Sequence, residues 1–127
     1  MVTRAMSFVR DDVPVVERAI QRTAFVTLCR NRGWLVGPTV HQQREGLWAW
    51  SLVLRKLQAE RCALVAVDSI DRIASTEVGR VAVLALLDRE NVRLVAIRDG
   101  IDTADTDGRA LVQDLISAPG PRPLIRQ

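Results

Sequence analysis

Ala63-Leu64-Val65-Ala66-Val67 is an uninterrupted apolar run, and Asp68-Ser69-Ile70-Asp71-Arg72 follows it at once. The run has the length of a strand, and its side chains do not alternate between apolar and polar. A strand that is apolar on both faces is typical of a parallel sheet that helices cover on both sides. The stretch therefore predicts a central parallel strand of an α/β domain.

Three more strands are predicted around this run. Thr3–Val9 is the first strand of the chain, Trp34–Val36 is a short second strand that Gly37-Pro38 ends, and Val92–Ile97 is another buried strand. The polar segment Thr39–Glu45 is expected to be a loop.

Four helices are predicted between and after the strands. The first begins after Asp11-Asp12-Val13-Pro14, where acidic residues and an early proline favour a helix start, and it ends before Gly33. Its apolar residues at helical spacing predict the face that packs on the sheet: Val16, Ile20, Ala24 and Leu28. The other three helices are expected at Leu47 to about Arg61, Ser75–Arg89 and Thr106–Ala118.

This alternation of strands and helices predicts an α/β three-layer sandwich. The sheet is expected to be mostly parallel, with the strand order 2-1-3-4 and room for a short fifth strand, because right-handed crossovers place helices on both faces. One domain should span about residues 1–118. Pro119–Pro123 stops the last helix, which leaves residues 119–127 as a short proline-bearing tail.

Composition restricts the class of protein. The 127 residues are 48% hydrophobic and carry a formal net charge of +3, which suits one globular core and excludes disorder as the main state. No apolar run approaches the roughly 20 residues that cross a bilayer, so we expect a cytoplasmic protein without a membrane segment. Cys29 and Cys62 are expected to be buried thiols, and the absence of a glycine-rich phosphate loop predicts no cofactor.

Polar side chains follow the first and third predicted strands. In the order 2-1-3-4 these strands are neighbours, and open α/β sheets bind ligands outside the carboxyl ends of such a pair. Exposed loops are polar in any case, so the pattern leaves a binding site and an ordinary surface equally open. The residues concerned are Arg10, Asp11 and Asp12 after the first strand, and Asp68, Asp71 and Arg72 after the third.

Three stretches resemble the catalytic domain of the serine recombinases, the resolvase and invertase family. Val92–Leu115 is similar to the family's strand followed by "IDT", a spacer and "GR". Ala63–Ser75 is similar to its "DRLxR" region, and Arg44-Glu45-Gly46-Leu47 is similar to its "RPGL" helix start. The stretches occur in the family's order, so the resemblance implies a resolvase-like fold over roughly residues 3–118.

The resemblance also implies a site. In this family a serine hydroxyl attacks a DNA phosphodiester while arginines neutralise the phosphate. Carried over to the matching positions, a phosphate pocket would contain Arg10, Arg44, Asp71 and Arg72, with Asp12 at the position of the nucleophile.

Departures from the family pattern argue against strand cleavage. Asp12 replaces the serine of "RxS", and Ser75 replaces the second arginine of "DRLxR". An ionised carboxylate repels a phosphate, so we expect an inactive domain that acts through protein or weak DNA binding. Leu111, Leu115 and Ala118 are expected to cover the sheet, which predicts a monomer or a weak dimer through a face other than the last helix.

A second resemblance supplies an alternative. Asp11, Asp12 and Asp68 look like the acidic cluster of a response-regulator receiver domain, which holds Mg²⁺ through carboxylate oxygens. Against this alternative, no lysine follows a fifth strand, and Arg10 and Arg72 stand beside the acids. Binding of Mg²⁺ would distinguish the two hypotheses.

Overall fold

The computed structural model describes residues 2–42 and 47–117, without the side chains of residues 47 and 48. It contains a five-stranded sheet in the order β2-β1-β3-β4-β5. The first four strands are parallel, and β5 runs antiparallel to β4. Both the predicted strand order and the short fifth strand are confirmed. The strands are β1 (Arg4–Arg10), β2 (Leu35–Gln42), β3 (Leu64–Val67), β4 (Arg93–Ala96) and β5 (Ile101–Asp102).

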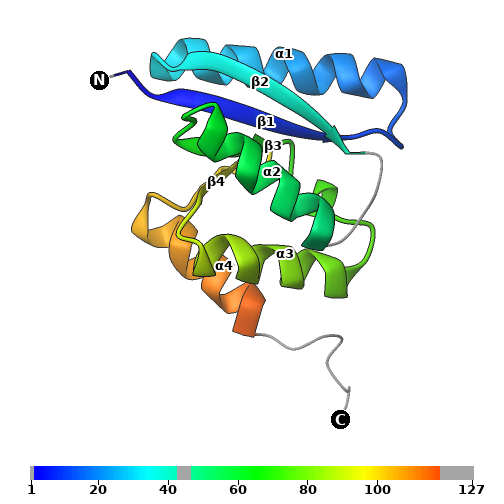
Figure 1. Cartoon of the computed structure of the whole chain (residues 1–127), viewed down its shortest axis with the longest axis vertical. Helices are drawn as coiled ribbons and strands as arrows, with labels where there is room; N and C mark the ends of the chain where they lie inside the picture. Colours follow the sequence, from blue (N-terminus) through cyan, green and yellow to red (C-terminus); the bar gives the residue numbers. More distant parts are fainter. Residues whose placement is uncertain (1, 43–46, 118–127) are drawn as a thin grey trace.

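Helices cover both faces of the sheet, as the crossover rule requires. Helix α1 (Val15–Arg32) lies on one face, and α2 (Leu47–Ala59), α3 (Glu77–Arg89) and α4 (Thr106–Ser117) lie on the other (Figure 1). A short 3-10 helix, η1 (Ile70–Arg72), follows β3. The predicted three-layer sandwich is therefore correct. Within the described ranges, no helix is long and apolar enough to cross a membrane.

Trp50 anchors α2 in the larger of two apolar clusters. Its side chain is fully buried, and its ring lies 4.3 Å from the ring of Phe8 on β1, measured between centroids. Its indole N–H donates to the carbonyl of Ile73, 3.4 Å away. This contact fixes the segment that follows η1 against the core.

The sheet-facing side of α1 agrees with the prediction only in part, because Leu28 packs on the cluster at the sheet but Val16 and Ile20 do not. Val16 and Ile20 are 72% and 62% exposed, whereas Gln21, Phe25 and Cys29 are buried. Helix α1 carries two apolar stripes, and Phe25 and Cys29 pack on small side chains of β1 and β3 such as Ala5 and Ala66. The Phe25 ring is large enough to fill the space above these alanines, so the stripe that contains Phe25 and Cys29 faces the sheet.

Strand β2 is longer than predicted. Gly37 and Pro38 do not end it but form an irregularity, where the register with β1 shifts between Ala5 and Ser7. A Cβ on Gly37 would lie 2.4 Å from the carbonyl oxygen of Ala5, so only glycine allows this close approach. Beyond it, Thr39–Gln42 continues the strand instead of forming a loop, and the Ser7 and Thr39 hydroxyls are hydrogen-bonded at 2.7 Å.

Helix α4 leaves part of its apolar surface uncovered. Val112 is buried, but Leu111 and Leu115 are 46% and 39% exposed, because α4 packs beside α3 rather than over the middle of the sheet. The expectation that these leucines cover the sheet is therefore wrong. Ala118 and the predicted break at Pro119–Pro123 lie outside the described residues.

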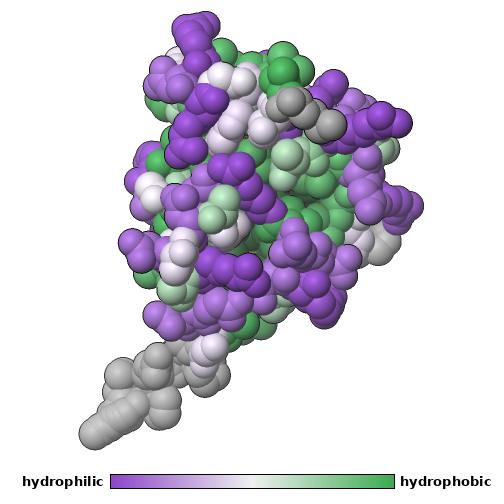
Figure 2. Space-filling model, turned by 90° about the vertical axis from the view of Figure 1, so that its left-hand side faces the viewer, coloured by the Kyte–Doolittle hydropathy of each residue, from purple (hydrophilic) through white to green (hydrophobic). Residues whose placement is uncertain are grey.

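The two ends of the sheet differ in what they present. Figure 2 looks onto the end at which β1 begins, where hydrophilic side chains form most of the surface and hydrophobic surface lines a hollow. The opposite end, at which β1 and β3 finish, carries the residues that the sequence analysis singled out.

Candidate functional site

The carboxyl ends of β1 and β3 are adjacent, and charged side chains from four segments gather there. We call this region the carboxyl edge. Arg10, Asp11 and Asp12 follow β1, and Asp68 follows β3. Two further segments contribute residues that the sequence analysis did not name: the start of α1 provides Glu17 and Arg18, and the loop after β4 provides Arg98 and Asp99.

Asp12, at the position of the family's nucleophile, binds the neighbouring arginine. The Nε of Arg10 donates to Oδ1 of Asp12 over 3.1 Å, and a second nitrogen, Nη2, contacts Oδ2. The Arg10 side chain is only 14% exposed, whereas that of Asp12 is 60% exposed. The carboxylate therefore occupies the outward face of this guanidinium.

Arg72 is paired in the same manner. Its Nη2 contacts Oε1 of Glu17 on the first turn of α1. Asp71, the other member of the "DR" pair, is exposed on η1. The backbone N–H of Ile70 donates to Oδ2 of Asp99 over 2.7 Å, which ties η1 to the loop after β4.

Two more acids of the carboxyl edge, Asp68 and Asp11, also have cationic partners. Asp68 is buried, and its Oδ2 lies 2.6 Å from Nη2 of Arg98. Asp11 lies 3.7 Å from Nη1 of Arg18 and 3.4 Å from Nδ1 of His41. Four carboxylates thus face four arginines, so little uncompensated positive charge is left at this edge.

Two further positions correspond to arginines of the family pattern, and they are Arg44 and Ser75 in this chain. Arg44 lies outside the described residues. Ser75, at the position of the family's second arginine, is exposed just before α3. Arg80, on α3, does not replace that cation at the surface, because its Nη1 donates to the carbonyl of Ala74 over 3.2 Å.

The acids of the receiver-like alternative do not form a metal site. In the part of the chain that the structure describes, no three His, Cys, Asp or Glu side chains are grouped so that they could hold a metal ion. Asp11, Asp12 and Asp68 each face an arginine instead. Carboxylates that already balance fixed cations are poor ligands for Mg²⁺, so the geometry lends this alternative no support.

The "IDT" and "GR" segments form a packing unit away from the carboxyl edge. The Arg93 guanidinium donates to both carboxylate oxygens of Asp102, over 2.9 and 2.7 Å, and these bonds lower the pKa of Asp102 despite its burial. The N–H of Leu94 donates to the Thr103 hydroxyl over 2.9 Å. Gly108 packs directly on the backbone of Asp102. These contacts hold β5 and the start of α4 together.

Trp34 covers the Asp102 pair on the α1 side of the sheet. The guanidinium carbons of Arg32 and Arg93 lie 5.2 and 5.1 Å from the centre of its ring. Arg32 also approaches Oδ2 of Asp102 to 3.7 Å. Two arginines therefore share one aromatic ring and one carboxylate, which is a structural arrangement rather than an open site.

The sequence contained a signal for some of the residues that the sequence analysis missed. Arg98 and Asp99 follow a buried strand, just as Arg10 and Asp68 do, so the carboxyl-end rule would have included them. Glu17 had no such signal, since only the packing of α1 brings it to Arg72.

Comparison with solved structures identifies the fold. The N-terminal catalytic domain of TP901-1 integrase superimposes with a TM-score of 0.71 at 15% identity, covering 89% of this chain and 91% of that one. A resolvase family site-specific recombinase from Streptococcus pneumoniae gives 0.66 at 13% identity, covering 89% of this chain and 85% of the other. The C-terminal catalytic domain of ISC1926 TnpA, an IS607-like serine recombinase, gives 0.58 at 17% identity and covers 90% and 78%.

By sequence, the chain matches no protein-family model and no curated protein. The structural likeness establishes that the chain has the fold of a serine recombinase catalytic domain.

Proposed function

We propose that this resolvase-like domain does not cleave DNA and instead acts by binding a macromolecular partner at its carboxyl edge. Serine recombinase chemistry needs a hydroxyl nucleophile and uncompensated cations around one phosphate. The carboxyl edge of this chain departs from both requirements.

The bond between Asp12 and Arg10 carries the proposal. Asp12 takes two nitrogens of the Arg10 guanidinium, for which a phosphate would have to compete, whereas a serine has no negative charge with which to bind them. The carboxylate also repels an incoming phosphate oxygen, since two like charges a few ångströms apart cost on the order of 1 to 4 kcal/mol near a protein surface. One substitution thus supports both the loss of the nucleophile and the loss of a phosphate contact.

The charge balance of this edge favours a protein partner over DNA. DNA binding draws most of its affinity from cations that neutralise phosphates. At this edge a phosphate would compete with Asp12 for Arg10 and with Glu17 for Arg72. DNA binding through these arginines and Arg44 should therefore be weak, whereas a protein can offer complementary charges of both signs.

We further propose a cytoplasmic location and weak self-association. Cys29 and Cys62 are free and buried, and burial raises the pKa of both thiols, which suits a reducing compartment. The exposed stripe of Leu111 and Leu115 on α4 is too short for a tight interface, which usually buries about 800 Å² on each partner.

A cleavage assay on supercoiled plasmid tests the proposal. The purified chain should leave the plasmid supercoiled, and denaturing gels should show no protein joined to DNA. As a matched substrate control, a serine recombinase with a known site should nick the same plasmid carrying that site. A covalent adduct formed by this chain would overturn the proposal.

A further inference from the structure

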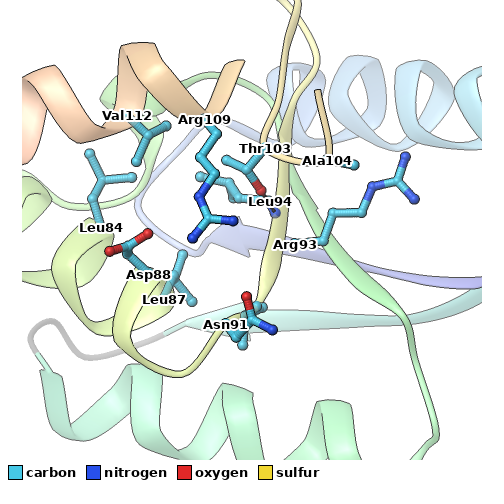
Figure 3. A pocket seen from close by; sticks show the side chains of 11 residues that line it. Leu84, Leu87, Asp88, Asn91, Arg93, Leu94, Thr103, Ala104, Arg109 and Val112 are labelled. Atoms are coloured by element: carbon cyan, nitrogen blue, oxygen red, sulfur yellow. Dashed lines mark hydrogen bonds between the residues drawn. The ribbon is translucent and has the colours of Figure 1, made fainter. Parts of the chain in front are cut away.

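A cavity of about 230 Å³ lies between α3, α4 and the start of β4, away from the carboxyl edge (Figure 3). Its apolar lining comes from four buried side chains on three elements: Leu84, Leu87, Leu94 and Val112. Buried apolar walls with a few polar groups at the rim are typical of small-molecule sites, although most such sites are somewhat larger.

Arg109 is the charged group of this cavity. Its side chain extends from α4 over the apolar floor, whereas Arg93 points away toward Asp102 (Figure 3). Within residues 2–42 and 47–117, the Arg109 guanidinium has no hydrogen-bond or ion-pair partner. It is also the one residue of the "IDT" and "GR" segments whose side chain no packing contact explains.

The acid that lines this cavity does not neutralise Arg109. Asp88 lines the same cavity, but its Oδ1 accepts a hydrogen bond of 2.8 Å from the Gln113 amide, and it forms no ion pair with Arg109. On the opposite rim, Asn91 adopts a left-handed backbone conformation, with φ of 57°, and contributes an amide side chain. The cavity therefore combines an apolar floor with one uncommitted cation, a neutral amide donor and a carboxylate that is bonded to Gln113.

We propose that this cavity binds a small organic carboxylate with an apolar body, such as an aromatic or branched aliphatic acid. The apolar body would displace water from the floor formed by Leu87 and Leu94, while the carboxylate would take two bonds from the Arg109 guanidinium. A larger anion is less favoured, because the shallower hollow of about 450 Å³ that adjoins Arg109 at the mouth is also lined by the carboxylate of Asp105.

Titration of the full chain with benzoate and with benzamide tests this site. The two probes have nearly the same shape, and only benzoate is charged. With ¹⁵N-labelled protein, benzoate should shift the amide signals of Leu87, Asn91 and Val112, and benzamide should bind at least about tenfold more weakly, because it lacks the charge-assisted bonds. Arg109→Gln should lower benzoate affinity by a similar factor, and Arg109→Lys should restore part of it.

Arg89→Gln provides the matched control. Arg89 is 71% exposed near the end of α3 and does not line the cavity, so removal of its charge should leave benzoate affinity within about twofold. The native signal dispersion of each variant confirms that it folds. Equal binding of benzoate and benzamide, unchanged affinity in Arg109→Gln, or benzoate shifts away from the cavity would overturn the proposal, as would the absence of any shift.

Discussion

Gly108 and Asp102 lie in backbone contact: a Cβ added to Gly108 would come within 2.2 Å of the Asp102 carbonyl oxygen. The first turn of α4 can approach β5 only because this position has no side chain. The glycine of the "GR" pair and the aspartate of "IDT" thus form one contact across the residues that separate them.

Gly108→Ala should therefore destabilise the fold by about 2–3 kcal/mol, because the added methyl forces α4 away from β5. The midpoint of urea denaturation measures the effect. Asp107→Ala, at the exposed neighbouring position, is the control and should change stability by no more than about 0.5 kcal/mol. Equal midpoints for Gly108→Ala and the wild type would show that the contact relaxes without cost.

Asp102→Asn should cost about 2 kcal/mol or more at neutral pH, since it leaves Arg93 without its carboxylate. The pKa of Asp102 is lowered in the folded state by the hydrogen bonds from Arg93. The stabilisation is thus complete above the unfolded pKa of about 3.9 and is lost as pH falls through the lower, folded value.

Urea denaturation from pH 7 down to pH 3 checks this dependence. The difference in stability between the wild type and Asp102→Asn should stay constant above about pH 5 and shrink at lower pH. A difference that grows on acidification would contradict the assigned direction of the shift.

Asp12→Ser should not create a recombinase. The substitution restores a hydroxyl and removes the carboxylate that faces Arg10, yet Ser75 still stands where the family pattern has an arginine. The expected result on supercoiled plasmid is neither nicking nor a covalent adduct. The double variant Asp12→Ser, Ser75→Arg is a more stringent test of the same expectation. Cleavage by the single variant Asp12→Ser would refute it.

The carboxylates of Asp12 and Glu17 should limit the affinity of the chain for DNA. Asp12→Asn and Glu17→Gln remove the negative charges that face Arg10 and Arg72, so together they should strengthen binding to a random duplex and steepen the log–log salt dependence by about 0.9 per phosphate gained. Fluorescence anisotropy at several salt concentrations gives both quantities. Glu90→Gln, just after α3, changes the net charge by half as much, and half of the gain there would mean that net charge alone decides.

Sedimentation should show a weak dimer that depends on α4. Leu111→Gln with Leu115→Gln should make the chain monomeric with little loss of thermal stability, because neither side chain belongs to the two buried core clusters. Val16→Gln with Ile20→Gln, on the exposed side of α1, serves as the control. Association lost only in the α1 variant would place the interface on that helix.

The fold could be predicted because its decisive signals are local. The unbroken apolar run of β3 and the capping residues of α3, where the Thr76 hydroxyl accepts from the N–H of Gly79, identify these elements from neighbouring residues alone. The packed face of α1 could not be chosen this way. Val16 and Ile20 fit a buried stripe as well as Phe25 and Cys29 do, and only the shape of the sheet decides between them.

The site could be predicted in part for the same reason. The sequence indicates that Arg10 and Asp12 belong to one strand end, two positions apart. It does not indicate that Glu17 meets Arg72, because that pair depends on how α1 lies relative to η1. Ion pairs between distant segments follow from the packing of whole elements. The charge balance of the carboxyl edge could therefore be determined only from the structure.

The Gly37-Pro38 irregularity in β2 also bears on how this chain behaves at high concentration. Strand β2 forms one border of the sheet, and an open border can recruit a strand from another molecule. Pro38 has no N–H to offer and interrupts the row of donors, while the opposite border, β5, is two residues long. Neither border provides a long template, so the same dipeptide that breaks the sequence pattern of a strand protects the folded chain from aggregation through its sheet.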